Sequence, residues 1–124
     1  MERNTRQRDA IRHVFETIPR PLGPYEVLTA ARKSVSGIGI ATVYRTINSL
    51  LTAGWLTDVL LPGETARYER AGAAHHHHFR CSECDRVFEI HGCPSNLQEL
   101  VPPGFELVSH HVTLFGRCAL CAAA

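Results

Sequence analysis

Two CxxC pairs constrain the fold of this 124-residue chain more than any other feature of its sequence. Cys81 and Cys84 are separated by 33 residues from Cys118 and Cys121. A CxxC turn presents two thiolates on one side of a tight loop, and two such turns complete a tetrahedron of ligands around Zn²⁺. Because four sulfur ligands leave no open coordination position, we expect a structural zinc site. Two redox-active motifs or buried free thiols are the alternatives.

A fifth cysteine, Cys93, makes the count odd, and the odd count favours metal binding in a reducing compartment over disulfides. The sequence has no apolar run of membrane length and no apolar segment behind a basic N-terminus. We therefore expect a cytoplasmic protein with no membrane association. In such a protein Cys93 is either a small buried residue or a spare metal ligand.

Apolar residues at helical spacing predict three helices in the first half of the chain, over residues 5–18, 24–35 and 41–53. Two strand-like runs, 55–61 and 65–70, then flank a Pro-Gly-Glu turn. Three helices followed by a hairpin is the order of a winged helix-turn-helix, whose third helix enters the DNA major groove. A small helical bundle with an appended hairpin is the alternative.

The predicted third helix has an outward face suited to DNA. Thr42, Tyr44 and Arg45 lie away from its apolar stripe, and no acidic residue occurs between Ile40 and Trp55. Such side chains contact thymine methyl groups, phosphates or guanine edges. This face therefore favours a nucleic-acid-binding domain over a plain helical bundle.

Composition divides the chain into two expected domains, residues 1–72 and 73–124, with a hinge at about residues 70–78. The first carries ten Lys/Arg against seven Asp/Glu, and the second three against five. The first domain is therefore the one that would face a polyanion. Because two domains of this size cannot each bury a large core, we expect a metal or a partner chain to add stability.

The second domain is predicted to be a small α/β unit. Residues 79–90 read as a strand, the first CxxC turn and a second strand, residues 95–100 as a short helix, and residues 105–116 as a strand leading to the second CxxC pair. Together with the winged helix, this places the chain in the α+β class.

Four consecutive histidines, His75 to His78, precede the first CxxC pair. In an extended strand successive side chains point to opposite faces, so His75 and His77 would face one way and His76 and His78 the other. Each pair of imidazoles suits Zn, Fe, Ni or Mn and needs further ligands. Nearby residues that could supply them are Glu69, Glu89, His110 and His111. A solvated histidine run and a purification tag are the alternatives.

The ordered segments GIATVYRTINSLLTAGW, RYER, HHHHFRCSEC and HHVTLFGRCALC resemble the ferric uptake regulator family of bacterial metal-sensing repressors, over nearly the whole chain. The resemblance implies an N-terminal winged helix, a C-terminal α/β dimerisation domain with a four-cysteine zinc site, and a homodimer. It further implies binding to palindromic, A/T-rich operators in double-stranded DNA when the sensing site holds Fe²⁺ or Zn²⁺, with Mn²⁺ and Ni²⁺ as alternatives. The sequence lacks HExxH, GxSxG and Gly-rich phosphate-loop motifs, so we expect neither catalysis nor a small-molecule substrate.

The resemblance also implies residue roles. It assigns the structural zinc to Cys81, Cys84, Cys118 and Cys121. It assigns the sensing site at the hinge to Glu69, His76, His78 and Glu89. It assigns the second site, within the dimerisation domain, to His75, His77 and His111. It assigns DNA contacts to Tyr44 and Arg45 on the recognition helix and to Arg8, which approaches the DNA backbone from the first helix.

The chain departs from the family pattern at several metal-site positions. Pro21 stands where many iron-type members have a histidine, and Ala71 where zinc-type relatives often have a cysteine. The acidic ligand of the second site would fall near Asn96, which is not a carboxylate. Residues that could substitute for it are Glu99, His91 and Cys93. These departures leave the sensed metal open. A peroxide sensor of the same family and a zinc-stabilised protein-interaction module that does not read DNA are the alternative functions.

Overall fold

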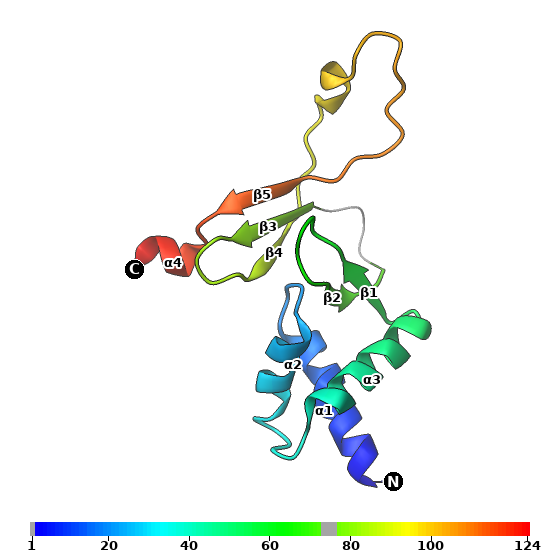
Figure 1. The fold of residues 1–124 in the computed structure, drawn as a ribbon, viewed down its shortest axis with the longest axis vertical. Coiled ribbons are helices and arrows are strands. Elements are labelled where there is room, and N and C mark those ends of the chain that lie inside the picture. The colour runs from blue at the N-terminus through cyan, green and yellow to red at the C-terminus, as the bar shows by residue number, and fades with distance from the viewer. Residues whose placement is uncertain (1, 73–76) are drawn as a thin grey trace. The chain divides into compact units, whose positions relative to one another are not determined.

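The computed structural model describes residues 2–72 and 77–124 (Figure 1). The chain divides into two compact units, Met1–Ala73 and Ala74–Ala124. Within the described residues, no helix is both long and apolar enough to cross a membrane. His75 and His76, two of the predicted metal ligands, lie outside the described residues.

The first unit begins with three helices, α1 (Glu2–Thr17), α2 (Pro24–Ala31) and α3 (Ile40–Thr52). Pro24 occupies the first turn of α2, where its missing N–H costs nothing. The N–H of Gly23 donates to Oε1 of Glu26 at 3.1 Å and so caps the same helix. All three helices were predicted from their apolar periodicity, and all three are confirmed.

The helices enclose one hydrophobic core. Its principal buried residues are Ile11, Val14, Phe15, Leu22, Val27, Ile38, Val43, Ile47, Leu50 and Leu56. Full burial of one such side chain contributes about 1.5–3 kcal/mol. The same apolar stripe that makes α3 pack inward leaves its opposite face free for solvent or a ligand.

A hairpin follows α3, and its strands β1 (Leu56–Val59) and β2 (Arg67–Arg70) pair antiparallel. Gly54, with φ of 78°, ends α3 and turns the chain into β1. Leu22, from the segment before α2, adds to the hairpin, because Leu22 and Tyr68 exchange two backbone N–H···O bonds of 2.9 Å. The hairpin is therefore anchored to the helices, which makes the unit a winged helix-turn-helix domain.

The second unit is a three-stranded sheet of β3 (His77–Cys81), β4 (Val87–Ile90) and β5 (Thr113–Gly116), in the order β4-β3-β5. β3 pairs antiparallel with β4 and parallel with β5. A four-residue 3₁₀ helix, η1 (Leu97–Leu100), stands where a short helix was predicted, and α4 (Ala119–Ala123), which was not predicted, follows the second CxxC pair.

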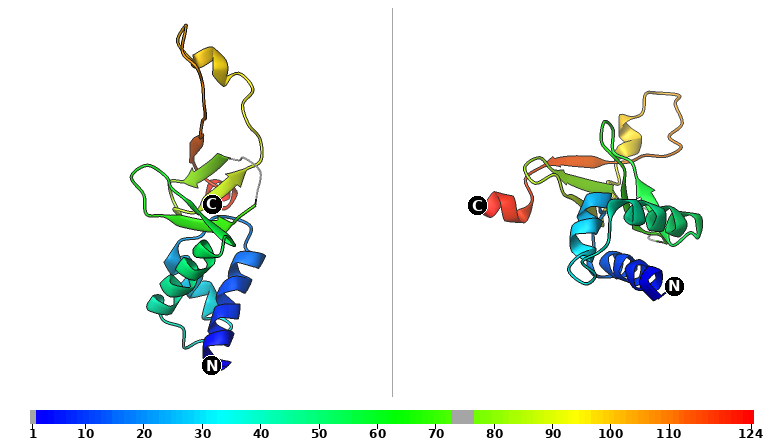
Figure 2. Two further views of the ribbon diagram at one scale, coloured as in Figure 1. Left: turned by 90° about the vertical axis from the view of Figure 1, so that its right-hand side faces the viewer. Right: turned by 60° about the horizontal axis from the view of Figure 1, so that its bottom comes forward.

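The strand predicted over residues 105–116 is wrong over most of its length, because only Thr113–Gly116 is strand. The segment from η1 to β5 extends away from the sheet, as Figure 1 and the left view of Figure 2 show. Phe105 and Val108 in this segment are 67% and 88% exposed. Their apolar pattern is typical of a strand, but no other strand of the described unit pairs with it.

The core of the second unit is small. Its fully or nearly buried apolar residues, among those described, are Cys81, Val87 and Cys118, and two histidines, His77 and His78, are buried with them. So little apolar burial leaves a unit of this size dependent on another source of stability, such as a metal or a partner chain.

Candidate metal centres and nucleic-acid interface

The four CxxC sulfurs lie together at the end of the sheet where β3 and β5 finish. All four lie within 4.8 Å of one another, and none forms a disulfide. The sulfurs of Cys84 and Cys118 are 3.8 Å apart. Tetrahedral Zn²⁺ with Zn–S bonds of about 2.3 Å sets its sulfurs about 3.8 Å apart. The cluster therefore fits a zinc ion, as the doubled CxxC spacing predicted.

Backbone hydrogen bonds in this cluster favour the ionised form of one cysteine. The N–H groups of Cys84 and Cys118 donate to the Cys81 sulfur at 3.4 and 3.3 Å. These bonds lower the pKa of Cys81 to about 6. The neighbouring Cys118 sulfur raises the pKa of Cys121 to about 12. Because adjacent thiolates repel one another, all four ionise together only when a cation offsets their charge.

Two ion pairs tie the loops of the two CxxC motifs in place. Arg80 on β3 pairs with Asp85 at 2.8 Å, just after the first motif. Arg117 pairs with Glu83 at 2.8 Å, which joins the second motif to the first, and its guanidinium also donates to the carbonyl of Cys121 at 2.7 Å. The loops are therefore held by contacts that do not involve the sulfurs.

His78 and Glu89, two of the predicted sensing residues, are neighbours across the sheet. They stand opposite each other in the β3–β4 ladder, so their side chains share one face. His111 lies against the same histidine, with its Nε2 3.0 Å from Nδ1 of His78. Glu69 lies on β2 in the first unit, where it is buried.

His77 lies close to Cys93, His110 and His111. Its Nε2 is 3.4 Å from the sulfur of Cys93, and that sulfur is 3.0 Å from Nε2 of His110. The resemblance grouped His111 with His77, and the ring centroids of these two histidines are 5.8 Å apart. The ring of His110 is closer to His77, at 5.0 Å, and the nearest nitrogen contact of His111 is with His78.

Cys93 is exposed, so the expectation that it is a small buried residue is wrong. Its contacts with two imidazoles agree with the other expectation, that of a spare metal ligand. The further candidates to replace the acidic ligand near Asn96, Glu99 and His91, are exposed and belong to neither metal-type cluster of the described residues.

The outward face of α3 carries the predicted DNA-contacting residues. Tyr44 and Arg45 are exposed, and Arg45 donates to Oγ1 of Thr42 at 3.1 Å. Arg8 reaches from α1 and donates to Oγ of Ser49 at 3.3 Å. Residues from both helices line a hollow of about 210 Å³: Arg8, Thr42, Arg45, Thr46 and Ser49. The helical spacing of Ser49 four residues after Arg45 was a signal that could have placed it on this face.

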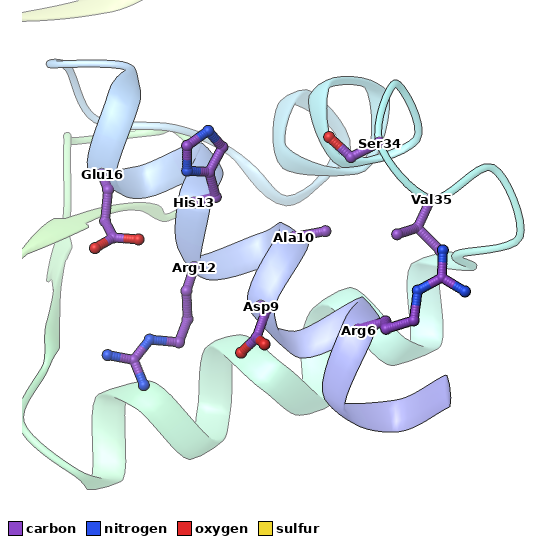
Figure 3. A pocket seen from close by; sticks show the side chains of 8 residues that line it. All are labelled: Arg6, Asp9, Ala10, Arg12, His13, Glu16, Ser34 and Val35. Carbon is purple, nitrogen blue, oxygen red and sulfur yellow. The ribbon is translucent and has the colours of Figure 1, made fainter. Parts of the chain in front are cut away.

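A second and larger hollow, of about 610 Å³, lies along another side of α1 (Figure 3). Its charged side chains all come from α1 and are of both signs: Arg6, Asp9, Arg12 and Glu16, with His13 beside them. Mixed charges of this kind do not select an anion or a cation, so the hollow does not resemble the basic face of α3.

Comparison with known proteins agrees with the fold. The ferric uptake regulator family model matches residues 2–115. The zinc uptake regulation protein of Mycobacterium tuberculosis is 33% identical over 122 residues, which are 96% of this chain and 94% of that protein. The ferric uptake regulation protein of Campylobacter jejuni is 34% identical over 87 residues, 68% of this chain, and the match spans 55% of that protein.

A solved structure extends the likeness to three dimensions. The Helicobacter pylori ferric uptake regulator, which has three functional metal-binding sites, superposes with a TM-score of 0.69 at 28% identity, covering 94% of this chain and 79% of that one. Because the family model covers both units of the fold, the chain belongs to the ferric uptake regulator family.

Proposed function

We propose that this protein is a metal-dependent, DNA-binding transcriptional repressor that controls genes of metal homeostasis and has no catalytic activity. Relatives are named for the uptake of iron, zinc or manganese. We infer Fe²⁺ or Zn²⁺ as the regulatory metal, ahead of Mn²⁺ and Ni²⁺. The observation that carries the proposal is the exposed face of α3, where Tyr44 and Arg45 stand on a helix with no acidic residue in its first turn.

In this proposal α3 enters the major groove of an A/T-rich palindrome. Tyr44 and Thr42 contact bases or phosphates, Arg45 a phosphate or a guanine edge, and Arg8 the backbone. The hydrogen bonds from Arg45 to Thr42 and from Arg8 to Ser49 support these roles, because they hold two long cationic side chains at the same face. Binding through phosphates should weaken steeply as salt concentration rises.

The regulatory metal is proposed to bind Glu69, His76, His78 and Glu89. The adjacency of His78 and Glu89 across the β3–β4 ladder supports this set, and the contact of His111 with His78 offers a further nitrogen ligand. The set draws Glu69 from the first unit and the others from the second. A bound metal would supply positive charge and a rigid centre, and its ligands would then couple the two units, so that the DNA-binding form of the dimer gains population.

The structural metal is proposed to be Zn²⁺ bound by Cys81, Cys84, Cys118 and Cys121. Four sulfur donors at tetrahedral spacing support this, as does the small core of the unit that contains them. The cysteines would close the ends of β3 and β5 together and hold the sheet, without taking part in sensing.

The DNA-binding form is proposed to be a homodimer that matches the two halves of a palindrome. β5 is an edge strand of its sheet, and on it Leu114 and Phe115 are 49% and 59% exposed. Exposed apolar residues on a free strand edge are a surface that association commonly covers.

The proposal is tested by titrating metal into protein that retains one zinc per chain, with a fluorescent palindromic A/T-rich duplex as the probe. Fluorescence anisotropy should show a rise in operator affinity of tenfold or more on adding Fe²⁺ without oxygen, or Zn²⁺. Unchanged affinity with every metal would remove the corepressor function.

Two variants separate the roles in that experiment. His78→Ala should lose the metal response while keeping its zinc and its helical circular dichroism, because His78 is outside the four-cysteine set. Arg45→Ala should lose operator affinity with no change in metal content. A protein that binds metal normally but shifts no promoter fragment would instead be a zinc-stabilised interaction module.

A further inference from the structure

We propose that Cys93 is a metal ligand that joins His77 and His110 in a mixed nitrogen–sulfur site for a borderline-soft divalent cation, best matched by Zn²⁺. The inference rests on the proposed function, because it concerns the second histidine site. It changes that site's ligands: Cys93 takes the part that a carboxylate near Asn96 would otherwise play, and His110 the part assigned to His111.

The three donor atoms already stand close to coordination spacing. The Cys93 sulfur is 3.4 Å from Nε2 of His77 and 3.0 Å from Nε2 of His110, and all three lie within 4.8 Å of one another. A tetrahedral zinc with Zn–N bonds of about 2.0–2.1 Å and Zn–S bonds of about 2.3 Å sets nitrogen and sulfur about 3.6 Å apart. Both sulfur–nitrogen distances are therefore within about 0.6 Å of the spacing that a bound cation requires.

The sheet topology accounts for this convergence. His77 is the first residue of β3, Cys93 comes three residues after the end of β4, and His110 comes three residues before β5. Because β4 runs antiparallel and β5 parallel to β3, the end of β4 and the starts of β3 and β5 meet at the same end of the sheet. Residues far apart in sequence are thus placed together by strand pairing.

Burial gives the site an inner wall and an open side. His77 is 1% exposed, His110 is half-buried and Cys93 is exposed, so a cation could reach the sulfur from solvent. The Cys93 sulfur also lies 3.8 Å from the carbonyl of Pro94, a weak contact. On coordination the thiol proton leaves to solvent and the sulfur binds as thiolate.

The ring of His77 would change its tautomer on binding. The N–H of Val112 donates to Nδ1 of His77 at 2.9 Å, so Nε2 carries the ring proton and faces the Cys93 sulfur. Coordination through Nε2 requires the proton on Nδ1, where it would face the N–H of Val112. Metal binding therefore breaks the Val112 hydrogen bond and requires the His77 ring to tilt away from that N–H. This change of tautomer gives the site a signature in ¹⁵N-resolved histidine NMR spectra.

The sulfur also predicts which metals are accepted. Thiolate and imidazole donors suit Zn²⁺ and Co²⁺, whereas Mn²⁺ prefers oxygen ligands. A carboxylate in place of Cys93 would have moved the preference toward Mn²⁺. The proposed site should therefore bind Zn²⁺ at a concentration at which Mn²⁺ leaves the site empty.

Alkylation of Cys93 tests the proposal in the zinc-loaded, reduced full chain without DNA. Trypsin cleaves after Arg86 and Arg117, and the peptide 87–117 contains Cys93 as its single cysteine, which allows its modification to be measured by mass spectrometry. Zn²⁺ added beyond the equivalent that the four CxxC cysteines hold should slow alkylation by N-ethylmaleimide at least tenfold, and equal Mn²⁺ should not. Equal rates with and without Zn²⁺ would overturn the proposal.

Matched variants identify the ligands. His110→Ala should abolish the protection, whereas His91→Ala, which removes an exposed histidine two residues from Cys93, should keep it. Protection that survives in His110→Ala would also overturn the ligand set. As a second readout, Co²⁺ added to the zinc-loaded protein should give a thiolate-to-metal charge-transfer band that Cys93→Ser loses while retaining one zinc per chain.

These outcomes are separate from those of the operator titration. Protection of Cys93 by Zn²⁺ in a protein whose operator affinity ignores metal would support this site and remove the corepressor function. A metal-dependent operator affinity with no protection of Cys93 would support the corepressor function and remove this site.

Discussion

At the scale of single residues, Asp85 has a backbone conformation that residues with side chains rarely adopt. Asp85 lies directly after the first CxxC pair, and its φ of 63° is in the left-handed region. The N–H of Asp85 donates to the carbonyl of Cys81 at 3.0 Å, and its carboxylate pairs with Arg80. The turn requires this conformation, and the ion pair helps to offset its cost.

At position 85 a glycine variant should therefore be more stable than an alanine variant, the reverse of the order in a helix. Asp85→Ala and Asp85→Gly both lose the ion pair, but glycine adopts positive φ without a Cβ clash. We expect Asp85→Gly to be more stable than Asp85→Ala by about 1 kcal/mol. Denaturant unfolding at constant zinc concentration measures the difference, and equal stabilities would show that the turn carries no backbone strain.

Arg8 and Ser49 can be distinguished by the salt dependence of operator binding. Arg8→Ala should lower the slope of log affinity against log salt by about one per bound protomer, because one phosphate contact is lost. Ser49→Ala should weaken binding severalfold at an unchanged slope, because the charge remains and only its position is less fixed. Arg6→Ala is the control, since Arg6 is on α1 but lines the separate hollow of Figure 3. A larger slope change for Arg6 than for Arg8 would contradict the assignment.

At the scale of elements, β3 carries candidate metal ligands at both of its ends. His77 and His78 begin the strand, and Cys81 ends it. Both neighbouring strands pair with β3, so the register of this one short strand positions the four-cysteine cluster and the histidine clusters alike.

Loss of one CxxC ligand should therefore affect the second unit and spare the first. Cys81→Ser should release zinc and unfold the sheet, because three thiolates with so small a core do not hold it. The helices, with their own core, should remain. Hydrogen exchange should show lost protection in residues 77–116 and retained protection in α1 and α3. Uniform loss across both units would show that they unfold together.

The elements also show what the sequence could reveal and what it could not. The helices α1, α2 and α3 were predictable because apolar residues at a spacing of three and four recur over several turns. The four-cysteine cluster was predictable because each half is a local motif. The contacts of Cys93 with His77 and His110 were not, because they depend on the pairing of β5 with β3, which no local pattern specifies. The strand predicted at Phe105 and Val108 was wrong because an apolar pattern is typical of a buried strand but does not show whether another strand pairs with it. In the described chain none does, and both residues are exposed.

At the scale of the whole molecule, the exposed apolar residues of the second unit are best explained by association. Leu114 and Phe115 on β5 and Leu120 on α4 are exposed apolar side chains on the unit that was predicted to dimerise. Covering them in a two-fold dimer would also match the symmetry of a palindromic operator.

A charge on β5 should separate the protomers. Phe115→Glu should shift the protein from dimer to monomer in sedimentation velocity and reduce operator affinity by at least tenfold, since a monomer contacts one half-site. Leu60→Glu is the matched control, because Leu60 is equally exposed but follows β1 in the first unit. A dimer that survives the charge on Phe115 would place the interface elsewhere.

The position of β3 between its two sets of candidate ligands implies an order in time. The imidazoles of His77 and His78 stand beside their partners only when β3 is paired with β4 and β5. That pairing is closed at the far end by the four cysteines. If the four cysteines hold zinc as proposed, a newly made chain must acquire that zinc before its histidines can bind a regulatory metal. Chains made during zinc starvation would then not respond to the regulatory metal, whichever metal that is.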